Sequence, residues 1–261
     1  MFDFHMHSKI SFDSTGDPLE MIKAAEAAEL KEICFTDHYD FNDVFIGQDD
    51  LFSMDEYRAT YEVLKSNSVK LRHGAEFGLT PWNTAQFKEF AGGYNFDFII
   101  GSVHCVDGYD PYFKEFWEQG GSGTAFERYL LKTLECVKVH DGFDVLGHIN
   151  YVCKSEHNPT HSALKYADYS EISDEIMRTV AQKGIGMEIN TSGIDRVSEP
   201  LPSLDYIKRF RELGGEIITV GSDAHDSTRV GQHIDKALDI AREVFGYVCT
   251  FEGRKPIFHK L

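Results

Sequence analysis

Short apolar runs alternate with helical patterns along the whole chain, and no other feature constrains the fold as strongly. Each run has the length of one buried strand. Asp17-Pro18 combines an N-cap residue with proline at the first helical position, which marks the start of the first helix. Two later helical patterns, residues 171–184 and 203–215, end in glycine, as helices often do. Repeated strand–helix units predict parallel strands with helices outside them. The strand-like runs are residues 2–5, 32–36, 69–75, 97–101, 143–147, 185–190 and 216–221.

Histidines stand at or just beyond the ends of five of these runs. Residue types that bind metals, repeated at the ends of successive parallel strands, favour a barrel with a site on one rim over an open sheet. In the His5-Met6-His7 motif, strand alternation puts both imidazoles on the same face. The set predicts a polynuclear metal centre at the carboxyl ends of the strands. The histidines concerned are His5, His7, His38, His104, His148 and His225.

Carboxylates occupy comparable places. Glu76 follows the run KLRHGA, and a carboxylate can bridge two cations, which an imidazole cannot. Asp223 precedes His225 by two residues, so both side chains point to one side if the strand continues. Asp13, in SFDST, fits either a metal ligand or a turn residue. Asp37 fits either a group that orients an imidazole or the cap of the next segment.

The charge balance narrows the range of partners. The chain has 26 Lys and Arg against 43 Asp and Glu, which gives a formal net charge of −17. This charge argues against nucleic acid or an anionic membrane as the main partner. A phosphorylated substrate is not excluded, because bound metal cations reverse the local sign of the field. No apolar stretch approaches the ~20 residues that a membrane-spanning helix needs.

The remaining signals concern compartment and organisation. The N-terminus MFDFHMHSKI lacks the basic and apolar regions of a signal peptide, and the five scattered cysteines form no CxxC pair, so we expect a reduced, cytoplasmic compartment. No linker or repeat divides residues 1–261, and we expect one domain. Residues 154–170 form a long irregular segment and are a candidate lid. Residues 247–258, YVCTFEGRKPIF, are either a closing strand or a tail packed against the barrel.

The motifs HMH, TDH, GAEFG, GSVH, LGHINYV and GSDAH follow one another in this order and closely resemble the polymerase and histidinol phosphatase (PHP) superfamily. The match spans nearly the whole chain, and a liganding residue stands at each of the family's nine ligand positions. The resemblance implies a distorted seven-stranded, TIM-like α/β barrel with a trinuclear metal site. Other segments, among them MEINTSG and FEGRKPIF, are similar to the histidinol-phosphate phosphatase branch.

Carried over residue by residue, the resemblance implies three divalent ions. Mixed imidazole and carboxylate ligands suit zinc, manganese and iron alike, so the metal stays open. The ligand groups of the first and second ions would both include Glu76, which would bridge these two ions. The ligand group of the third ion would not include Glu76. These groups are His5, His7, Glu76 and Asp223; Glu76, His104 and His148; and Asp13, His38 and His225.

The same resemblance implies hydrolysis of a phosphate monoester, with L-histidinol phosphate as the substrate and L-histidinol and phosphate as products in histidine biosynthesis. Lys154 stands where related phosphatases often have a basic residue, and it would meet phosphate as a point charge. Further candidate substrate contacts are Asn190 and Arg196. The candidate catalytic residues are Glu76, Asp223 and His225.

Three alternatives stay open. The first is a PHP-type phosphoesterase acting on another small phosphate ester or on a nucleotide. The second is a catalytically silent metal-binding module, against which the full ligand set argues. The third is a metal-dependent amidohydrolase, whose usual bridging lysine has no counterpart at a strand end here. No GxSxG, P-loop or GxGxxG motif supports a serine hydrolase or a nucleotide-binding fold.

Overall fold

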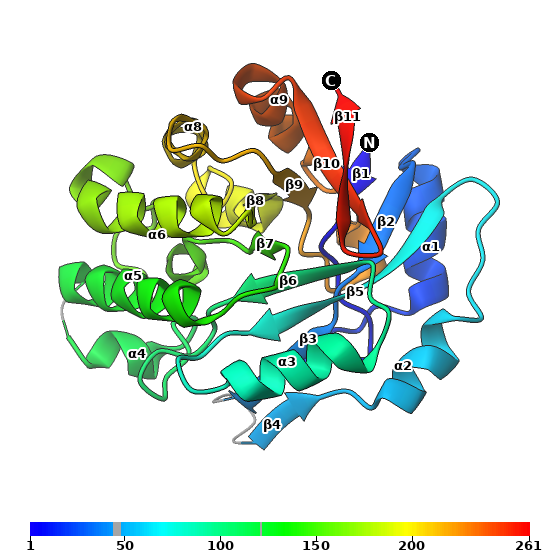
Figure 1. Ribbon diagram of the computed structural model, residues 1–261, viewed down its shortest axis with the longest axis horizontal. Helices are drawn as coiled ribbons and strands as arrows, with labels where there is room; N and C mark the ends of the chain where they lie inside the picture. Colours follow the sequence, from blue (N-terminus) through cyan, green and yellow to red (C-terminus); the bar gives the residue numbers. More distant parts are fainter. Residues whose placement is uncertain (44–47, 121) are drawn as a thin grey trace.

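Seven parallel strands form a nearly closed barrel in the computed structural model, which describes residues 1–43, 48–120 and 122–261. The predicted seven-stranded α/β barrel is therefore confirmed (Figure 1). Each predicted run contains one strand, although the strand ends differ by a few residues. In barrel order the strands are β1 (Phe2–Asp3), β2 (Glu32–Phe35), β5 (Lys70–Gly78), β6 (Phe98–Ser102), β7 (Val145–Leu146), β8 (Gly186–Asn190) and β9 (Ile218–Gly221).

The barrel closes where the chain beyond β1 meets the chain beyond β9. The backbone N–H of Phe4 donates to the carbonyl of Val220 at 3.0 Å. Further along, Asp223 N donates to His5 O and His7 N donates to Ala224 O, each at 2.8 Å. This closure fixes the backbone on both sides of the HxH motif, so both imidazoles are held inside the rim.

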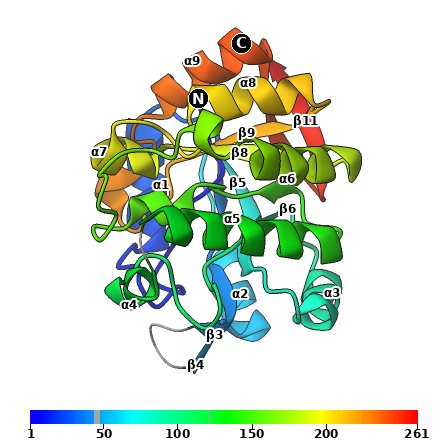
Figure 2. The same ribbon diagram turned by 90° about the vertical axis from the view of Figure 1, so that its left-hand side faces the viewer.

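Helices cover the outside of the barrel, as the alternating pattern predicts. Asp17 caps the first helix by accepting from Leu19 N, and Pro18 is its first residue. The chain leaves two later helices at Gly184 and Gly214, with φ angles of +71° and +97° that favour glycine. Figure 2 shows three of the outer helices, α5, α6 and α8, side by side. The helices are α1 (Pro18–Ala27), α2 (Met54–Tyr61), α3 (Thr84–Gly93), α4 (Lys114–Glu118), α5 (Ser122–Val139), α6 (Ser170–Gln182), α7 (Ile194–Val197), α8 (Leu204–Glu212) and α9 (Ile234–Val244).

None of the helices in the described ranges combines the length and the apolar character needed to cross a membrane.

A hairpin of two strands, β3 (His38–Asp43) and β4 (Gln48–Leu51), was not predicted from the sequence. In β3 the aromatic residues Tyr39 and Phe41 alternate with polar ones, so the segment lacks the continuous apolar run that marks the other strands. β3 pairs with β5, and β4 pairs with β3. His38 lies opposite Glu76 in that parallel register. The long β5 strand thus pairs with β2 along its first half and with β3 along its second half, which distorts the barrel and brings His38 next to Glu76.

The C-terminal segment forms a separate antiparallel hairpin of β10 (Tyr247–Glu252) and β11 (Lys255–Lys260). Of the two alternatives for this segment, the packed tail is the correct one. The hairpin covers the amino end of the barrel strands, where the ring of Phe251 lies 4.9 Å from that of Phe98. Arg72 adds an ionic contact there, with its Nη2 donating to Glu252 at 2.7 Å.

We predict that Phe251→Ala lowers the free energy of unfolding by about 3–5 kcal/mol, because it removes a fully buried ring from the amino end of the barrel. Chemical denaturation measures this loss. Phe258→Ala is the control: this ring is 53% exposed on the same hairpin, and its removal should change stability by less than about 0.5 kcal/mol. Equal effects of the two substitutions would contradict this role of the hairpin.

Candidate metal centre

All nine predicted metal ligands lie together at the carboxyl ends of the barrel strands. They come from seven segments: the chain after β1, the loop before α1, β3, β5, and the segments that follow β6, β7 and β9. Seven of the nine line a pocket of about 380 Å³, and His5 and His7 lie fully buried beneath it. The pocket residues are Phe12, Asp13, His38, Asp40, Glu76, His104, Asp110, Tyr112, Phe113, His148, Tyr151, Lys154, Asp223 and His225.

Four donor atoms have the spacing of a tetrahedral metal shell. His5 Nε2 lies 3.0 Å from His7 Nε2, and Glu76 Oε2 lies 3.2 and 3.3 Å from these two nitrogens. Asp223 Oδ1 lies 3.7 and 3.4 Å from the same nitrogens. A tetrahedral shell with metal–ligand distances of about 2.0–2.2 Å has edges of about 3.3–3.6 Å. These four side chains therefore fit a divalent cation.

Glu76 presents its two oxygens to two different sets of imidazoles. Whereas Oε2 faces His5 and His7, Oε1 lies 2.8 Å from His148 Nε2 and 3.4 Å from His104 Nε2. Ser102 Oγ donates to Oε1 at 2.6 Å and helps to fix the carboxylate. This is the arrangement that a carboxylate bridging two cations requires.

The buried oxygen Glu76 Oε2 has no hydrogen-bond donor among the described residues. An unsatisfied, ionised oxygen in a protein interior is costly unless a cation or a donor compensates it. A divalent ion between the imidazoles would compensate it. The chemistry of the donor set thus supports divalent metal binding.

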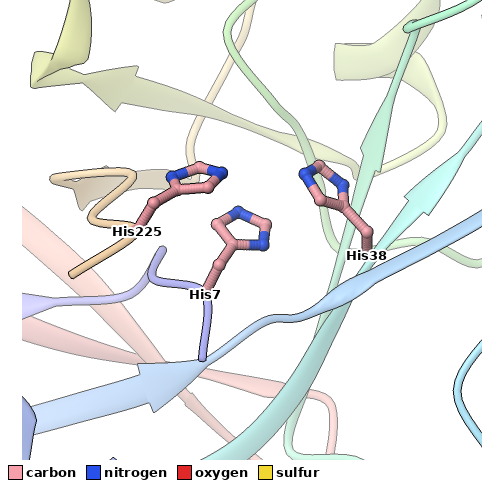
Figure 3. A group of neighbouring side chains, drawn as sticks. All are labelled: His7, His38 and His225. Atoms are coloured by element: carbon pink, nitrogen blue, oxygen red, sulfur yellow. The ribbon is translucent and has the colours of Figure 1, made fainter. Parts of the chain in front are cut away.

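A further group lies nearer to the pocket mouth. Asp13 Oδ2 is 3.1 Å from His225 Nε2 and 3.6 Å from His38 Nε2. Figure 3 shows the imidazoles of His7, His38 and His225 converging from three separate segments. The ring of His7 lies between the other two, with centroid distances of 4.2 Å to His38 and 4.3 Å to His225.

Within the cluster, positive groups favour the ionised form of the carboxyls, and the carboxylates favour the protonated form of His38. Burial opposes ionisation of Glu76 and Asp223, but the imidazoles and Lys154 outweigh burial and hold both carboxyl pKa values well below their usual range. Burial likewise disfavours the charged form of His38, but Asp13 and Glu76 outweigh it and raise its pKa to about 10. Without metal, the neighbouring carboxylates therefore keep His38 protonated at neutral pH, whereas burial lowers the pKa of His7.

Several side chains that sequence reasoning missed hold the predicted ligands in place. Asp40 Oδ2 lies 2.9 Å from His104 Nδ1, and Glu188 Oε1 lies 2.6 Å from His5 Nδ1. Strand alternation was the signal that could have found both, because Asp40 is two residues from His38 and Glu188 is two residues from Asn190.

Asp37 orients a histidine through a serine. Its Oδ1 accepts from Ser11 Oγ at 3.0 Å, and Ser11 Oγ lies 3.2 Å from His7 Nδ1. Asp37 also precedes a strand and not a helix, so the capping alternative does not apply.

The three candidate substrate contacts have different surroundings. Lys154 lines the pocket, with its Nζ 2.6 Å from Asp223 Oδ2. Arg196 is exposed and donates to the hydroxyl of the pocket residue Tyr112 at 3.1 Å. Asn190 is fully buried behind Asp223, with its Nδ2 3.4 Å from Asp223 Oδ2, and does not line the pocket. In this structure Asn190 thus contacts Asp223, and its contact with substrate stays a prediction.

The segment 154–170, expected as a lid, is anchored on its pocket side. Ser155 Oγ donates to the carbonyl of Tyr112 at 2.6 Å and accepts from Trp117 Nε1 at 3.0 Å. Asn158 is fully buried, and its side chain bonds the carbonyls of Cys153 and Ser162. Of this segment, Lys154 is the residue that lines the pocket.

Comparisons with known proteins agree with this geometry. The PHP domain family model matches residues 3–192. The chain is 33% identical to the probable histidinol-phosphatase of Clostridium acetobutylicum, over 99% of this chain and 96% of the relative. It is also 33% identical to the histidinol-phosphatase of Lactococcus lactis, over 97% of this chain and 95% of the relative.

Solved structures share the fold. The crystal structure of histidinol phosphate phosphatase from Lactococcus lactis, complexed with zinc, L-histidinol and phosphate, superposes with a TM-score of 0.85. That protein is 30% identical, and the alignment covers 98% of both chains. A putative histidinol phosphatase from Listeria monocytogenes, 17% identical, has a TM-score of 0.75 over 90% of this chain and 99% of that one, and supports the fold alone.

We predict that metal binding releases protons at neutral pH. An imidazole must be neutral to bind a metal, and the pKa of His38 near 10 means that its proton is lost on binding. The apparent affinity should therefore increase with pH across the neutral range. Calorimetry of zinc binding in buffers of different ionisation enthalpy measures the released protons. If the heat of zinc binding does not depend on the buffer, no proton is released, and this would contradict a protonated His38 in the metal-free protein.

Proposed function

The chain belongs to the PHP domain family, and from this we propose that it is a metal-dependent phosphomonoesterase that hydrolyses L-histidinol phosphate to L-histidinol and phosphate. One observation carries the proposal: a buried carboxylate, Glu76, faces two sets of imidazoles beneath a pocket that suits a small phosphate ester. The relationship to histidinol-phosphatases extends over nearly the whole chain, so residues 1–261 would act as one phosphatase domain.

We propose that the pocket holds three divalent ions of zinc, manganese or iron. When bound, such ions activate water and neutralise the charge on phosphoryl oxygens. Glu76 Oε2 and Oε1 would each contact one ion, and the third ion would lie at the pocket mouth. The proposed sets are His5, His7, Glu76 and Asp223; Glu76, His104 and His148; and Asp13, His38 and His225.

The chain's own residues bind and orient the ester. Lys154 Nζ, at the pocket wall beside Asp223, supplies a positive charge for the phosphate. Arg196 lies behind Tyr112 and reaches the pocket through that hydroxyl. Asp223 and His225 both line the pocket and are proposed catalytic residues beside Glu76. Because the carboxyl of Asp223 is ionised, it would bind a cation and would not donate a proton.

The acidic lining supports a substrate with a cationic end. Histidinol carries an amine and an imidazole, and both attract carboxylates. Lys154 is the single lysine or arginine among the pocket-lining residues of the described chain. The lining carboxylates are Asp13, Asp40, Glu76, Asp110 and Asp223. A panel of phosphomonoesters tests this choice, and preference for a neutral ester or a nucleotide over L-histidinol phosphate would favour the alternative phosphoesterase.

We predict that Glu76→Gln and His148→Ala each lower kcat by at least about 10²–10³-fold, because each removes a ligand that positions charge at the reacting phosphate. Both variants should also contain less metal by elemental analysis. Glu135→Gln, an exposed glutamate on α5, is the matched control and should retain wild-type activity. Full activity of either site variant would contradict a metal-dependent reaction at this pocket.

We predict that Lys154→Ala raises KM for L-histidinol phosphate roughly ten- to a hundredfold, since a charged hydrogen bond contributes about 1.5–3 kcal/mol. Elemental analysis should show unchanged metal content, which separates loss of the phosphate contact from loss of an ion. Lys114→Ala, which removes an exposed lysine on α4, is the control. Unchanged kinetics of Lys154→Ala would exclude this lysine from the substrate site.

A further inference from the structure

Glu188 joins the segments that carry several of the proposed metal ligands, although it does not itself line the pocket. It lies on β8 and is 1% exposed. Its Oε1 lies 2.6 Å from His5 Nδ1, and its Oε2 accepts from the backbone N–H of His148 at 2.9 Å. Asn190 Nδ2 donates to the same Oε2 at 3.2 Å. One carboxylate thus contacts three separate N–H groups.

These contacts orient both sides of the bridging carboxylate. His5 Nε2 faces Glu76 Oε2, so the proton of a neutral His5 ring belongs on Nδ1, where Glu188 accepts it. The bond to His148 N holds the turn after β7 that directs His148 Nε2 to Glu76 Oε1. Asn190 extends the network to Asp223. A shift of Glu188 would therefore move donors on both sides of Glu76.

The backbone leaves room for this carboxylate. A Cβ atom at Gly221, on the neighbouring strand β9, would overlap His5 Cβ and Glu188 Oε1. The close approach of β9, His5 and Glu188 thus depends on glycine at this position.

We propose that Glu188 is the positioning residue of the metal centre, which sets the tautomer of His5 and holds His148 in register. The proposal rests on the proposed function only in taking this cluster as the metal site. An amide cannot take over the role, because glutamine offers one accepting oxygen and one NH₂ group. In either orientation of the amide, its NH₂ group would face an N–H donor, that of His5 Nδ1 or that of the His148 backbone. Glu188→Gln therefore removes one of the two accepting oxygens while it keeps the size of the side chain.

Zinc binding to metal-free protein tests the proposal. Competition with a chromophoric chelator gives the affinity, and elemental analysis gives the number of ions. We expect Glu188→Gln to bind the ion held by His5 about 10–100-fold more weakly than the wild type. Excess zinc should restore part of the lost phosphatase activity. An affinity within twofold of the wild type would overturn the proposal.

Glu32→Gln is the matched control. Glu32 is also a buried glutamate on a barrel strand, but it pairs with Arg72 at the opposite, amino end. Its substitution should lower the melting temperature and leave zinc affinity unchanged. A similar loss of zinc affinity in both variants would show a general effect of destabilisation and would overturn the proposal.

Glu188→Asp covers the case in which the glutamine variant does not fold. The shorter side chain keeps the charge but cannot reach both His5 and His148, so zinc affinity should again fall about tenfold or more. Wild-type affinity in this variant would overturn the proposal. Failure of the wild-type protein to hydrolyse any phosphomonoester would instead refute the proposed function, and the zinc affinities would still decide the role of Glu188.

Discussion

The arrangement of this protein depends on a buried carboxylate, Glu76, that lies among imidazoles from β3 and from the chain that follows β1, β6 and β7. Burial disfavours its charge, and neighbouring positive groups are what keep it ionised. Those groups reach it because β5 is long: its first half pairs with β2 and its second half with β3. The distortion of the barrel and the formation of the candidate metal centre thus have the same structural origin.

The amino end of the barrel stabilises the fold, whereas the carboxyl end carries the candidate metal centre. At the amino end, the β10–β11 hairpin packs Phe251 on Phe98, and Arg72 joins Glu32 to Glu252. These contacts are satisfied within the protein and stabilise the fold. At the carboxyl end, polar groups such as Glu76 Oε2 stay without a hydrogen bond among the described residues. The protein can hold such groups because the rest of the barrel is well packed, and a metal site requires them.

The sequence predicted the barrel and eight of the nine candidate ligands from local patterns: apolar runs, caps, and polar residues at strand ends. The ninth, Asp13, rested mainly on the resemblance to the PHP superfamily. The sequence did not predict the β3–β4 hairpin, whose short strands contain no continuous apolar run and join the barrel where β3 pairs with β5. It also missed the role of Glu188: strand alternation puts Glu188 on the same face as Asn190, but it does not show that His5, 183 residues away in the chain, is the partner. Asn190 was assigned to the substrate for a similar reason, since only the packing of β8 against Asp223 shows that it is covered.

The most direct test of the central role of Glu76 is anomalous diffraction from crystals of the metal-loaded protein. The account predicts one ion beside each carboxylate oxygen of Glu76, with the two ions separated by about 3.5–4 Å. The ion at Oε2 should also contact His5 and His7, and the ion at Oε1 should contact His104 and His148. A single ion, or ions that do not touch Glu76, would contradict the account.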